Sequence, residues 1–316
     1  MKIVFTDRDT VTNGDISFGA FESLGEVTGY GVTAPELAAE RVKDADAVLC
    51  NKTLITAEVM KAAEHLRYIG ILATGCNNVD LAYAKERGIV VTNVPGYSTD
   101  GVVQLVFSYI LELSGNLSRY RDSVDAGDWK KSPTFSYFPY PMTCVAGKTL
   151  GVVGFGAIGS RVAAVGAALG MNVIVHTRTE KPGCPYKFVD LDTLLRESDI
   201  VTLHCPLTPQ SQDLINAGTI AKMKDGAVLI NTSRGPVVDE KALRAALDSG
   251  KLSGAGLDVL RSEPMAEDCP LFGAPNCIIT PHIAWAASET RQRLMKIAED
   301  NLAAFIKGEP INVVNS

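Results

Sequence analysis

The segment that most restricts the possible folds covers residues 149–162 and reads TLGVVGFGAIGSRV. An apolar run leads into three glycines that open a helical stretch, and a second apolar run follows at 171–176. The glycines are Gly154, Gly156 and Gly159. In this arrangement the first glycine permits a tight turn, the second lets the backbone approach a pyrophosphate, and the third lets helix and strand pack closely. N–H groups at the start of the helix, at Ala157 and Ile158, favour an anion. A glycine-rich turn without a ligand is the alternative, but the strand, helix and second strand together favour a dinucleotide-binding domain.

The residues after the second strand indicate which dinucleotide binds. About 20 residues beyond the glycines an NAD-selective site usually offers an acidic residue to the ribose, whereas this strand ends in Thr177 and Arg178. A hydroxyl beside a guanidinium can receive a 2′-phosphate, and no carboxylate stands there to repel it. We therefore expect NADP to be favoured over NAD. The alternative is that Arg178 is a solvated loop residue and that Glu180 serves the ribose.

Apolar runs suited to strands buried on both faces recur along the whole chain. They lie at residues 3–5, 47–50, 68–72, 89–92, 150–153, 173–175, 200–203, 227–230, 256–259 and 277–280. Segments between them, such as 35–42 and 240–247, have helical spacing. Continuous apolar strands that alternate with helices predict an α/β fold with doubly wound parallel sheets.

The length of 316 residues favours two domains, because single cores rarely grow beyond roughly 250–300 residues. A helical pattern from about Asp100 to Arg121 follows a Pro-Gly turn signal at 95–96. A loop at 130–147, rich in proline and aromatic residues, then precedes the fresh series of strands. We place the first domain boundary near residue 100.

Composition excludes several classes of protein. The net charge of −6 argues against nucleic acid as a partner, because phosphate binding needs a basic face. Seven scattered cysteines without a Cys-x-x-Cys pair, and four histidines none of which lies close to another, predict no disulfide framework and no metal site. No apolar run approaches the ~20 residues that cross a bilayer, and the N-terminus lacks the features of a signal peptide. The expected location is the cytoplasm, away from membranes.

Three side chains on loops after strands suit hydride transfer at C2 of a small 2-keto acid. Such a reaction needs a cation for the carboxylate and carbonyl, a proton donor, and a carboxylate that orients the donor. Arg234 suits the first role, since its guanidinium can hold a carboxylate with two hydrogen bonds; a surface salt bridge is the alternative. Glu263 is a candidate for the third role, although a loop glutamate is usually just solvated. His282 is the acid–base candidate by elimination, because His65 is expected within a helix, and His176 and His204 end strands on the cofactor side. A structural histidine remains the alternative.

At these residues the chain resembles the D-2-hydroxyacid dehydrogenase family, over essentially its whole length. The matching stretches are 73–80, 93–99, 151–159, 204–208, 231–235, 256–259, 262–264 and 280–283. The resemblance implies a flavodoxin-like substrate domain (residues 1–99 plus 287–316) with a Rossmann dinucleotide-binding domain (100–286) inserted into it, and an active site in the cleft between them. It also implies a homodimer, paired through the long helix that starts at Asp100 and the aromatic loop.

The resemblance assigns roles to individual residues. Arg234 would bind the substrate carboxylate and carbonyl, His282 would donate and accept the proton, and Glu263 would be its partner. Backbone N–H groups around Thr74, Gly75 and Cys76 would hold the other carboxylate oxygen. The residues implied at the cofactor, besides the glycine turn, are Asp258 at the nicotinamide carboxamide, Thr232 and Ser233 beside the nicotinamide, and His204, Cys205 and Pro206 at the adenosine end.

Within the family the chain looks most like the hydroxypyruvate reductase (glycerate dehydrogenase) and glyoxylate reductase branch. Lys52, in Asn-Lys-Thr after the strand at 47–50, would reach a polar substrate tail; an exposed loop lysine is the alternative. Two departures from the family pattern are the Asp100-Gly101 start of the long helix and the missing acidic residue after the second strand of the dinucleotide domain. A rival hypothesis is a binding protein of the same fold, similar to corepressors that sense a dinucleotide and recruit partners.

Overall fold

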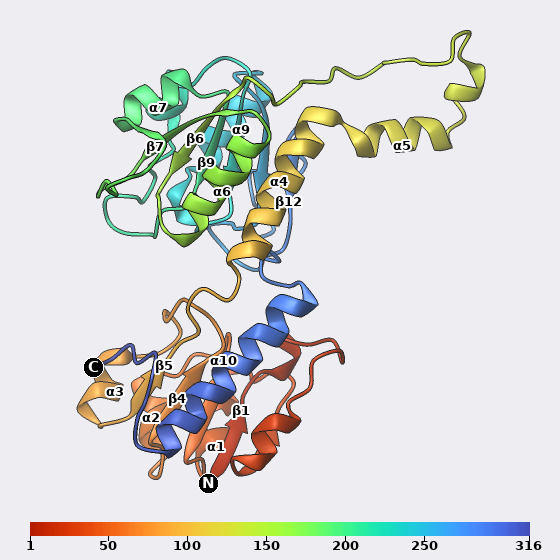
Figure 1. Ribbon diagram of the computed structural model, residues 1–316. Coiled ribbons are helices and arrows are strands. Elements are labelled where there is room, and N and C mark those ends of the chain that lie inside the picture. Colours follow the sequence, from red (N-terminus) through yellow and green to blue (C-terminus); the bar gives the residue numbers. More distant parts are fainter. The chain divides into compact units, whose positions relative to one another are not determined.

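The computed structural model describes residues 1–316 and divides into two units (Figure 1). Unit 1 comprises Met1–Ser98 and Trp285–Ser316, and unit 2 comprises Thr99–Ala284. Each unit is built on one parallel sheet with helices, which confirms the α/β prediction. No helix has the length and apolar character that a bilayer span requires.

Unit 1 has a five-stranded sheet in the order β2-β1-β3-β4-β5. Its strands are β1 (Lys2–Phe5), β2 (Glu26–Gly29), β3 (Ala47–Cys50), β4 (Tyr68–Ile71) and β5 (Val90–Thr92). Its helices are η1 (Arg8–Thr10), η2 (Gly19–Ser23), η3 (Pro35–Leu37), α1 (Ala38–Val42), α2 (Ala57–Ala62), α3 (Leu81–Glu86) and α10 (Ser288–Ile306). The strand order is that of flavodoxin, with the direction of winding reversed between β1 and β3.

The apolar runs explain four of these strands, while β2 was not predicted. Strands β3 and β4 are buried at every position, as expected for central strands of a parallel sheet. Strand β2 lies at the edge and is mostly exposed, so it needs no apolar run and leaves no signal in the sequence. Helix α10, from the end of the chain, packs on β4, where the rings of Phe305 and Tyr68 lie 4.9 Å apart.

Unit 2 has a seven-stranded sheet in the order β12-β11-β10-β9-β6-β7-β8. Its strands are β6 (Thr149–Val153), β7 (Asn172–His176), β8 (Lys187–Phe188), β9 (Ile200–Leu203), β10 (Ala227–Asn231), β11 (Leu252–Leu257) and β12 (Cys277–Ile279). Its helices are α4 (Thr99–Gly115), α5 (Leu117–Asp125), η4 (Trp129–Lys131), α6 (Ala157–Ala168), α7 (Leu191–Glu197), α8 (Ala217–Lys222), η5 (Gly235–Val237) and α9 (Glu240–Asp248). The winding reverses between β6 and β9, and in such sheets ligands bind beyond the carboxyl ends of the strands at the reversal.

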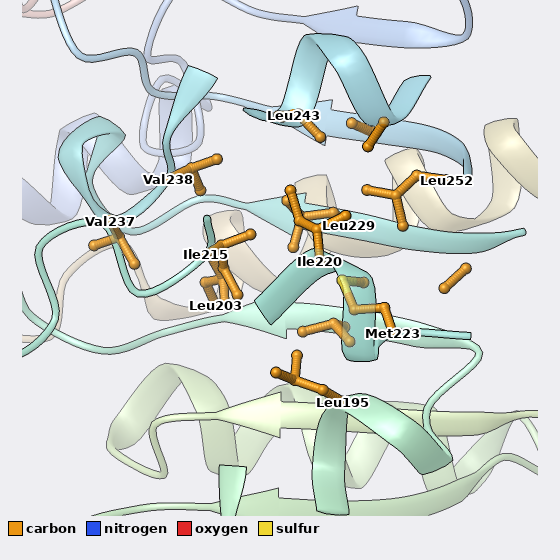
Figure 2. Close-up of a cluster of buried hydrophobic side chains, with 14 of the residues drawn as sticks. Leu195, Leu203, Ile215, Ile220, Met223, Leu229, Val237, Val238, Leu243 and Leu252 are labelled. Atoms are coloured by element: carbon orange, nitrogen blue, oxygen red, sulfur yellow. The ribbon is translucent and has the colours of Figure 1, made fainter. Parts of the chain in front are cut away.

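Both faces of the unit 2 sheet are covered. On one face, aliphatic side chains of β9, β10 and β11 interlock with those of α7, α8 and α9 (Figure 2). On the other, α4 and α6 bury a second cluster that includes Phe107 and Tyr109. Full burial of one large apolar side chain stabilises the fold by about 1.5–3 kcal/mol. The two helix layers therefore hold the sheet, and with it the loops at the carboxyl ends of its strands, in place.

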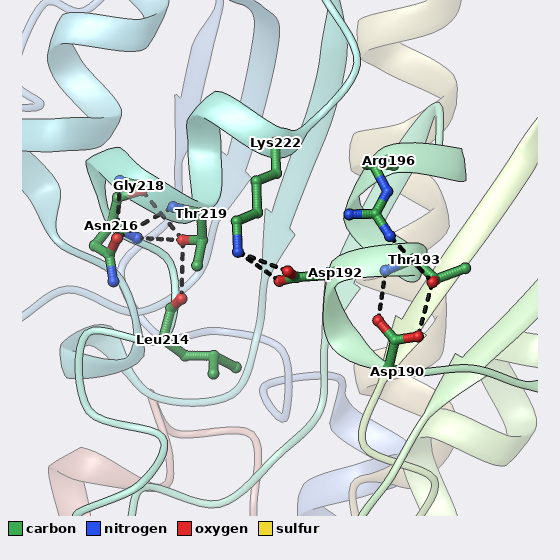
Figure 3. Close-up of polar contacts among 9 residues, drawn as sticks. All are labelled: Asp190, Asp192, Thr193, Arg196, Leu214, Asn216, Gly218, Thr219 and Lys222. Carbon is green, nitrogen blue, oxygen red and sulfur yellow. Dashed lines mark hydrogen bonds and ion pairs between the residues drawn. The ribbon is translucent and has the colours of Figure 1, made fainter.

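Capping residues set where the short helices α7 and α8 begin (Figure 3). The carboxylate of Asp190 accepts a hydrogen bond from the N–H of Thr193 at 2.8 Å, at the start of α7. Asn216 and Thr219 form a reciprocal capping box at the start of α8. Each cap contributes about 1 kcal/mol. Lys222 and Asp192 join the two helices by an ion pair at 2.7 Å, which is exposed and adds little.

Two sequence predictions about helices are wrong. The helix expected from about Asp100 to Arg121 is two helices, α4 and α5, separated at Asn116 with φ 51°. Asparagine tolerates this left-handed conformation, and its side chain donates to the carbonyl of Pro141 at 2.8 Å. His65 lies in the turn after α2 rather than within a helix. Gly101 does not prevent helix formation, since α4 begins two residues before it.

Candidate active site

The glycine turn of unit 2 connects β6 to α6. Gly154 has φ 92°, and a side chain there would meet the backbone carbonyl oxygen of His204 at 2.6 Å. At Gly159 a Cβ would lie 2.0 Å from the carbonyl oxygen of Gly154, so α6 packs directly on the turn. A Cβ at Gly156 would meet nothing within 4 Å. The turn therefore leaves open space beside Gly156 and the first N–H groups of α6, a geometry that fits a pyrophosphate.

The other segments expected at the cofactor lie next to this turn. The N–H of Gly154 donates to the carbonyl of His176 at 2.8 Å, and that residue ends β7 just before Thr177 and the exposed Arg178. Strand β9, which pairs with β6, ends just before His204-Cys205-Pro206. Three predicted segments thus meet at one edge of the sheet.

The imidazole of His204 is packed within the fold and stays uncharged in the folded protein near neutral pH. Its Nε2 lies 2.8 Å from the hydroxyl of Thr202, and burial lowers the pKa of His204 to about 3. Burial also raises the pKa of the neighbouring Cys205 thiol. Both side chains are therefore neutral at ordinary pH, which is compatible with the expected contact with an adenosine.

His282 and Glu263 contact each other in unit 2. The Nδ1 atom of His282 lies 2.6 Å from Oε2 of Glu263, and Oε1 of the same carboxylate accepts a hydrogen bond from the N–H of Leu260 at 3.0 Å. The side chains of His282 and Glu263 are 32% and 38% exposed, so a small molecule can reach them. A carboxylate at Nδ1 holds the proton on that nitrogen in the neutral ring and leaves Nε2 to exchange a proton with a ligand.

Asp258 fixes the loop that carries His282. The residue is 1% exposed, and its carboxylate accepts hydrogen bonds from the hydroxyl of Thr280 at 2.5 Å and from the N–H groups of Ile283 and Ala284, both at 2.8 Å. Burial raises the pKa of Asp258, and these hydrogen bonds oppose that rise. His282 itself has φ 55°, an uncommon conformation for a residue other than glycine. This bracing role leaves no signal in the sequence, because only the fold brings residue 258 to the 280–284 loop.

The loop that carries Arg234 is braced in a similar way. Asn231, 1% exposed, donates from its amide to the carbonyl of Arg234 at 3.0 Å and accepts from the N–H and hydroxyl of Ser233. Arg234 is exposed, and its guanidinium donates to the carbonyl of Ser233 at 2.7 Å. The buried hydroxyl oxygen of Thr232 has no hydrogen-bond partner. An orphaned hydroxyl at the position expected beside the nicotinamide fits a polar ligand group there.

The Arg234 loop packs directly on the turn that carries Glu263. A Cβ on Gly235 would lie 1.9 Å from both the carbonyl carbon and oxygen of Leu260. Only glycine allows this backbone contact, which places η5 against the 260–263 turn. Unit 2 therefore unites the loops of the predicted guanidinium, imidazole and carboxylate at the sheet edge that also holds the glycine turn.

The residues expected at the substrate in unit 1 follow two adjacent strands. Lys52 comes after β3, and Thr74, Gly75 and Cys76 come after β4. The hydroxyl of Thr74 donates to the carbonyl of Val94 at 2.8 Å, and the carbonyl of Thr74 accepts from the Asn93 amide at 2.8 Å. These bonds hold the 74–76 segment at the carboxyl end of the sheet, where its backbone N–H groups can meet an anion.

Comparisons with known proteins agree with this chemistry. Residues 107–284 match the family model described as D-isomer specific 2-hydroxyacid dehydrogenase, NAD binding domain. The chain is 43% identical to a hydroxypyruvate reductase of Blautia hydrogenotrophica, over the full length of both proteins.

Two solved structures share the fold over nearly the whole chain. A D-lactate dehydrogenase from Aquifex aeolicus, complexed with NAD and lactic acid, has a TM-score of 0.85 and 32% identity and covers 99% of each chain. An acyclic imino acid reductase in complex with NADPH and D-Arg has a TM-score of 0.87 and 28% identity, and covers 99% of this chain and 100% of the other. All three relatives are named as oxidoreductases, which does not favour the rival hypothesis of a corepressor-like binding protein. The chain belongs to the D-isomer-specific 2-hydroxyacid dehydrogenase family of nicotinamide-dependent oxidoreductases.

Proposed function

We propose that the protein reduces hydroxypyruvate to D-glycerate, and glyoxylate to glycolate, with NADPH favoured over NADH. The observation that carries the proposal is the 2.6 Å contact between His282 and Glu263, on a unit that also holds a glycine turn open at Gly156. The similarity to a hydroxypyruvate reductase over the full chain supports the choice of substrate.

Three side chains of unit 2 have separate roles in the proposed reaction. The nicotinamide, when bound, supplies the hydride that C2 of the keto acid receives. His282, as imidazolium, donates the Nε2 proton to the oxygen on C2, and Glu263 stabilises the charged ring through Nδ1. Arg234 binds the substrate carboxylate and polarises the carbonyl, so negative charge that develops on the oxygen meets a fixed cation. In the reverse direction His282 accepts the proton.

Residues of unit 1 bind the rest of the substrate in this proposal. The backbone N–H groups of Thr74, Gly75 and Cys76 take the second carboxylate oxygen, and the Lys52 ammonium takes the polar tail. Asp258 acts at the nicotinamide carboxamide as well as on the loop of His282, and Thr232 and Ser233 lie beside the nicotinamide ring.

The proposed preference for NADPH rests on Thr177 and Arg178. Arg178 is exposed just after the end of β7, and a guanidinium at this position can pair with a 2′-phosphate. The two structural relatives bind NADPH in one case and NAD in the other, so the fold serves either cofactor and the local side chains decide.

The test is an assay of the purified protein with hydroxypyruvate, glyoxylate and pyruvate, each with NADPH and NADH, followed by absorbance of the reduced nicotinamide. We expect turnover of the first two acids. Arg234→Ala should lower kcat/KM by about 10²–10⁴-fold, while Arg196→Ala, an exposed arginine on α7, should leave it unchanged. Absence of turnover with every acid, or full activity of Arg234→Ala, would overturn the proposal.

A homodimer is the second part of the proposal. Helix α5 and the loop after it project from the rest of unit 2 (Figure 1), and they expose Leu117, Trp129, Phe135 and Phe138, the last two by 91% and 82%. Apolar side chains gathered on one projection are typical of a protein interface. Light scattering should give twice the chain mass. The double change Phe135→Ser and Phe138→Ser should give a monomer, while Phe272→Ser, on another loop, should not.

A further inference from the structure

A buried carboxylate in unit 1 holds the loop that carries Lys52. Asp7 is 2% exposed. One of its oxygens accepts from the N–H of Asn51 at 2.9 Å. The other accepts from the N–H groups of Lys52 and Thr53, each at 2.6 Å, and from the Thr53 hydroxyl at 2.9 Å. Three consecutive backbone N–H groups therefore converge on one side chain.

The same loop is fixed from two other sides. The amide of Asn78 donates to the carbonyls of Asn51 and Thr53, at 3.4 and 3.1 Å. The amide of Asn51 donates to the hydroxyl of Thr10 at 3.0 Å. Asn51 and Thr53 are 5% and 6% exposed, whereas Lys52 between them is exposed. The packing thus buries the two outer residues, and Lys52 is the exposed residue of the three.

This loop stands where the unit 1 sheet reverses its winding. Asp7 follows β1 and Lys52 follows β3, the two strands on either side of the reversal. The carboxyl ends of strands at such a point are where ligands bind in α/β sheets. The 74–76 segment, which follows the next strand, lies beside it.

We propose that Asp7 is a positioning residue, which holds the 51–53 loop so that Lys52 binds an oxygen on C3 of the substrate. The inference rests on the proposed function and adds the determinant of substrate choice to it. An ammonium has three donors and no acceptor, so it suits a C3 hydroxyl or an anionic C3 substituent. Hydroxypyruvate has a C3 hydroxyl, whereas glyoxylate has no C3. Asp7 and Lys52 therefore act on one substrate and not on the other.

The test compares the two substrates in three variants. Lys52→Met keeps the length of the side chain and removes its charge. It should lower kcat/KM for hydroxypyruvate by about 10–100-fold, the usual effect of losing a hydrogen bond from a charged group, mostly through KM, and change glyoxylate by less than about 3-fold. Asp7→Asn places an N–H₂ group against backbone N–H donors, and should shift the two substrates in the same unequal way. Asp9→Asn, an exposed carboxylate two positions away, should change neither.

The double variant separates positioning from a merely structural effect. If Asp7 acts through Lys52, adding Asp7→Asn to Lys52→Met should cause no further loss of hydroxypyruvate selectivity. Additive losses, or equal losses with both substrates, would overturn the inference. If Asp7→Asn fails to fold by circular dichroism, Lys52→Met alone decides, since unchanged selectivity in that variant refutes the proposal. Unselective wild-type activity would refute only this inference, whereas no activity with any keto acid would refute the proposed function itself.

Discussion

Replacement of Gly235 by alanine tests whether the loops of Arg234 and Glu263 depend on each other. The new Cβ would lie 1.9 Å from the carbonyl carbon and oxygen of Leu260 and 2.4 Å from the nitrogen of Arg261. All three are backbone atoms, so no side chain can turn aside. An ordinary contact needs about 3.4 Å, so the two loops must separate by about 1.5 Å, and a displacement of that order at a catalytic group costs about 10²-fold in rate.

We therefore expect Gly235→Ala to lower kcat by at least about 10²-fold, measured with hydroxypyruvate and NADPH at saturation. Strain of this kind also lowers the free energy of unfolding by about 1–3 kcal/mol, which urea titration measures. Gly115→Ala is the matched control, because its Cβ would meet Leu117 at an ordinary 3.8 Å. Wild-type turnover in a folded Gly235→Ala protein would show that the two loops move independently, and the reasoning would be wrong.

Three further predictions follow from the site. Glu263→Gln should lower kcat by about 10²–10⁴-fold with little change in stability, because the amide cannot stabilise an imidazolium; unchanged kcat would remove Glu263 from the mechanism. Burial lowers the pKa of His204 to about 3, so at mildly acidic pH the unfolded chain binds a proton at this histidine and the folded chain does not. The contribution of the buried neutral imidazole to the free energy of unfolding is therefore complete above about pH 6.5 and is lost as pH falls toward 3. Urea titrations across that range should show a smaller loss for His204→Gln than for the wild type. Arg178→Asp should shift the ratio of kcat/KM for NADPH over NADH toward NADH by at least about 10-fold, and an unchanged ratio would place the 2′-phosphate elsewhere.

The sequence predicted those parts of the fold that depend on local pattern. The glycine turn at 154–159 and the buried runs of β3, β4 and β9 are visible because burial on both faces demands continuous apolar residues. Strand β2 is exposed at an edge, and the break at Asn116 depends on one residue that accepts a left-handed conformation. Neither has a periodic signal.

The candidate site divides in the same way. Arg234, Glu263 and His282 could be chosen from residue type and from the family resemblance, and the structure places Glu263 and His282 in contact. The hydrogen bonds that brace their loops could not be predicted. Asp258 bonds to a loop that only the tertiary fold brings near, and the nearest partner of the Asp7 carboxylate, Asn51, lies 44 positions further along the chain. Sequence reasoning identifies groups with reactive chemistry more readily than the groups that hold them.

Residue 282 has to meet two requirements, a left-handed backbone conformation and, in the proposed mechanism, a side chain that exchanges a proton. Glycine or asparagine would adopt φ 55° with less strain, but neither can exchange a proton with a substrate. In a library randomised at residue 282, selection for heat resistance should therefore enrich glycine and asparagine. Selection of the same library for turnover should enrich histidine. The three hydrogen bonds that Asp258 accepts hold the 280–284 loop, and with it His282, the proposed proton donor, in a conformation that a histidine side chain disfavours.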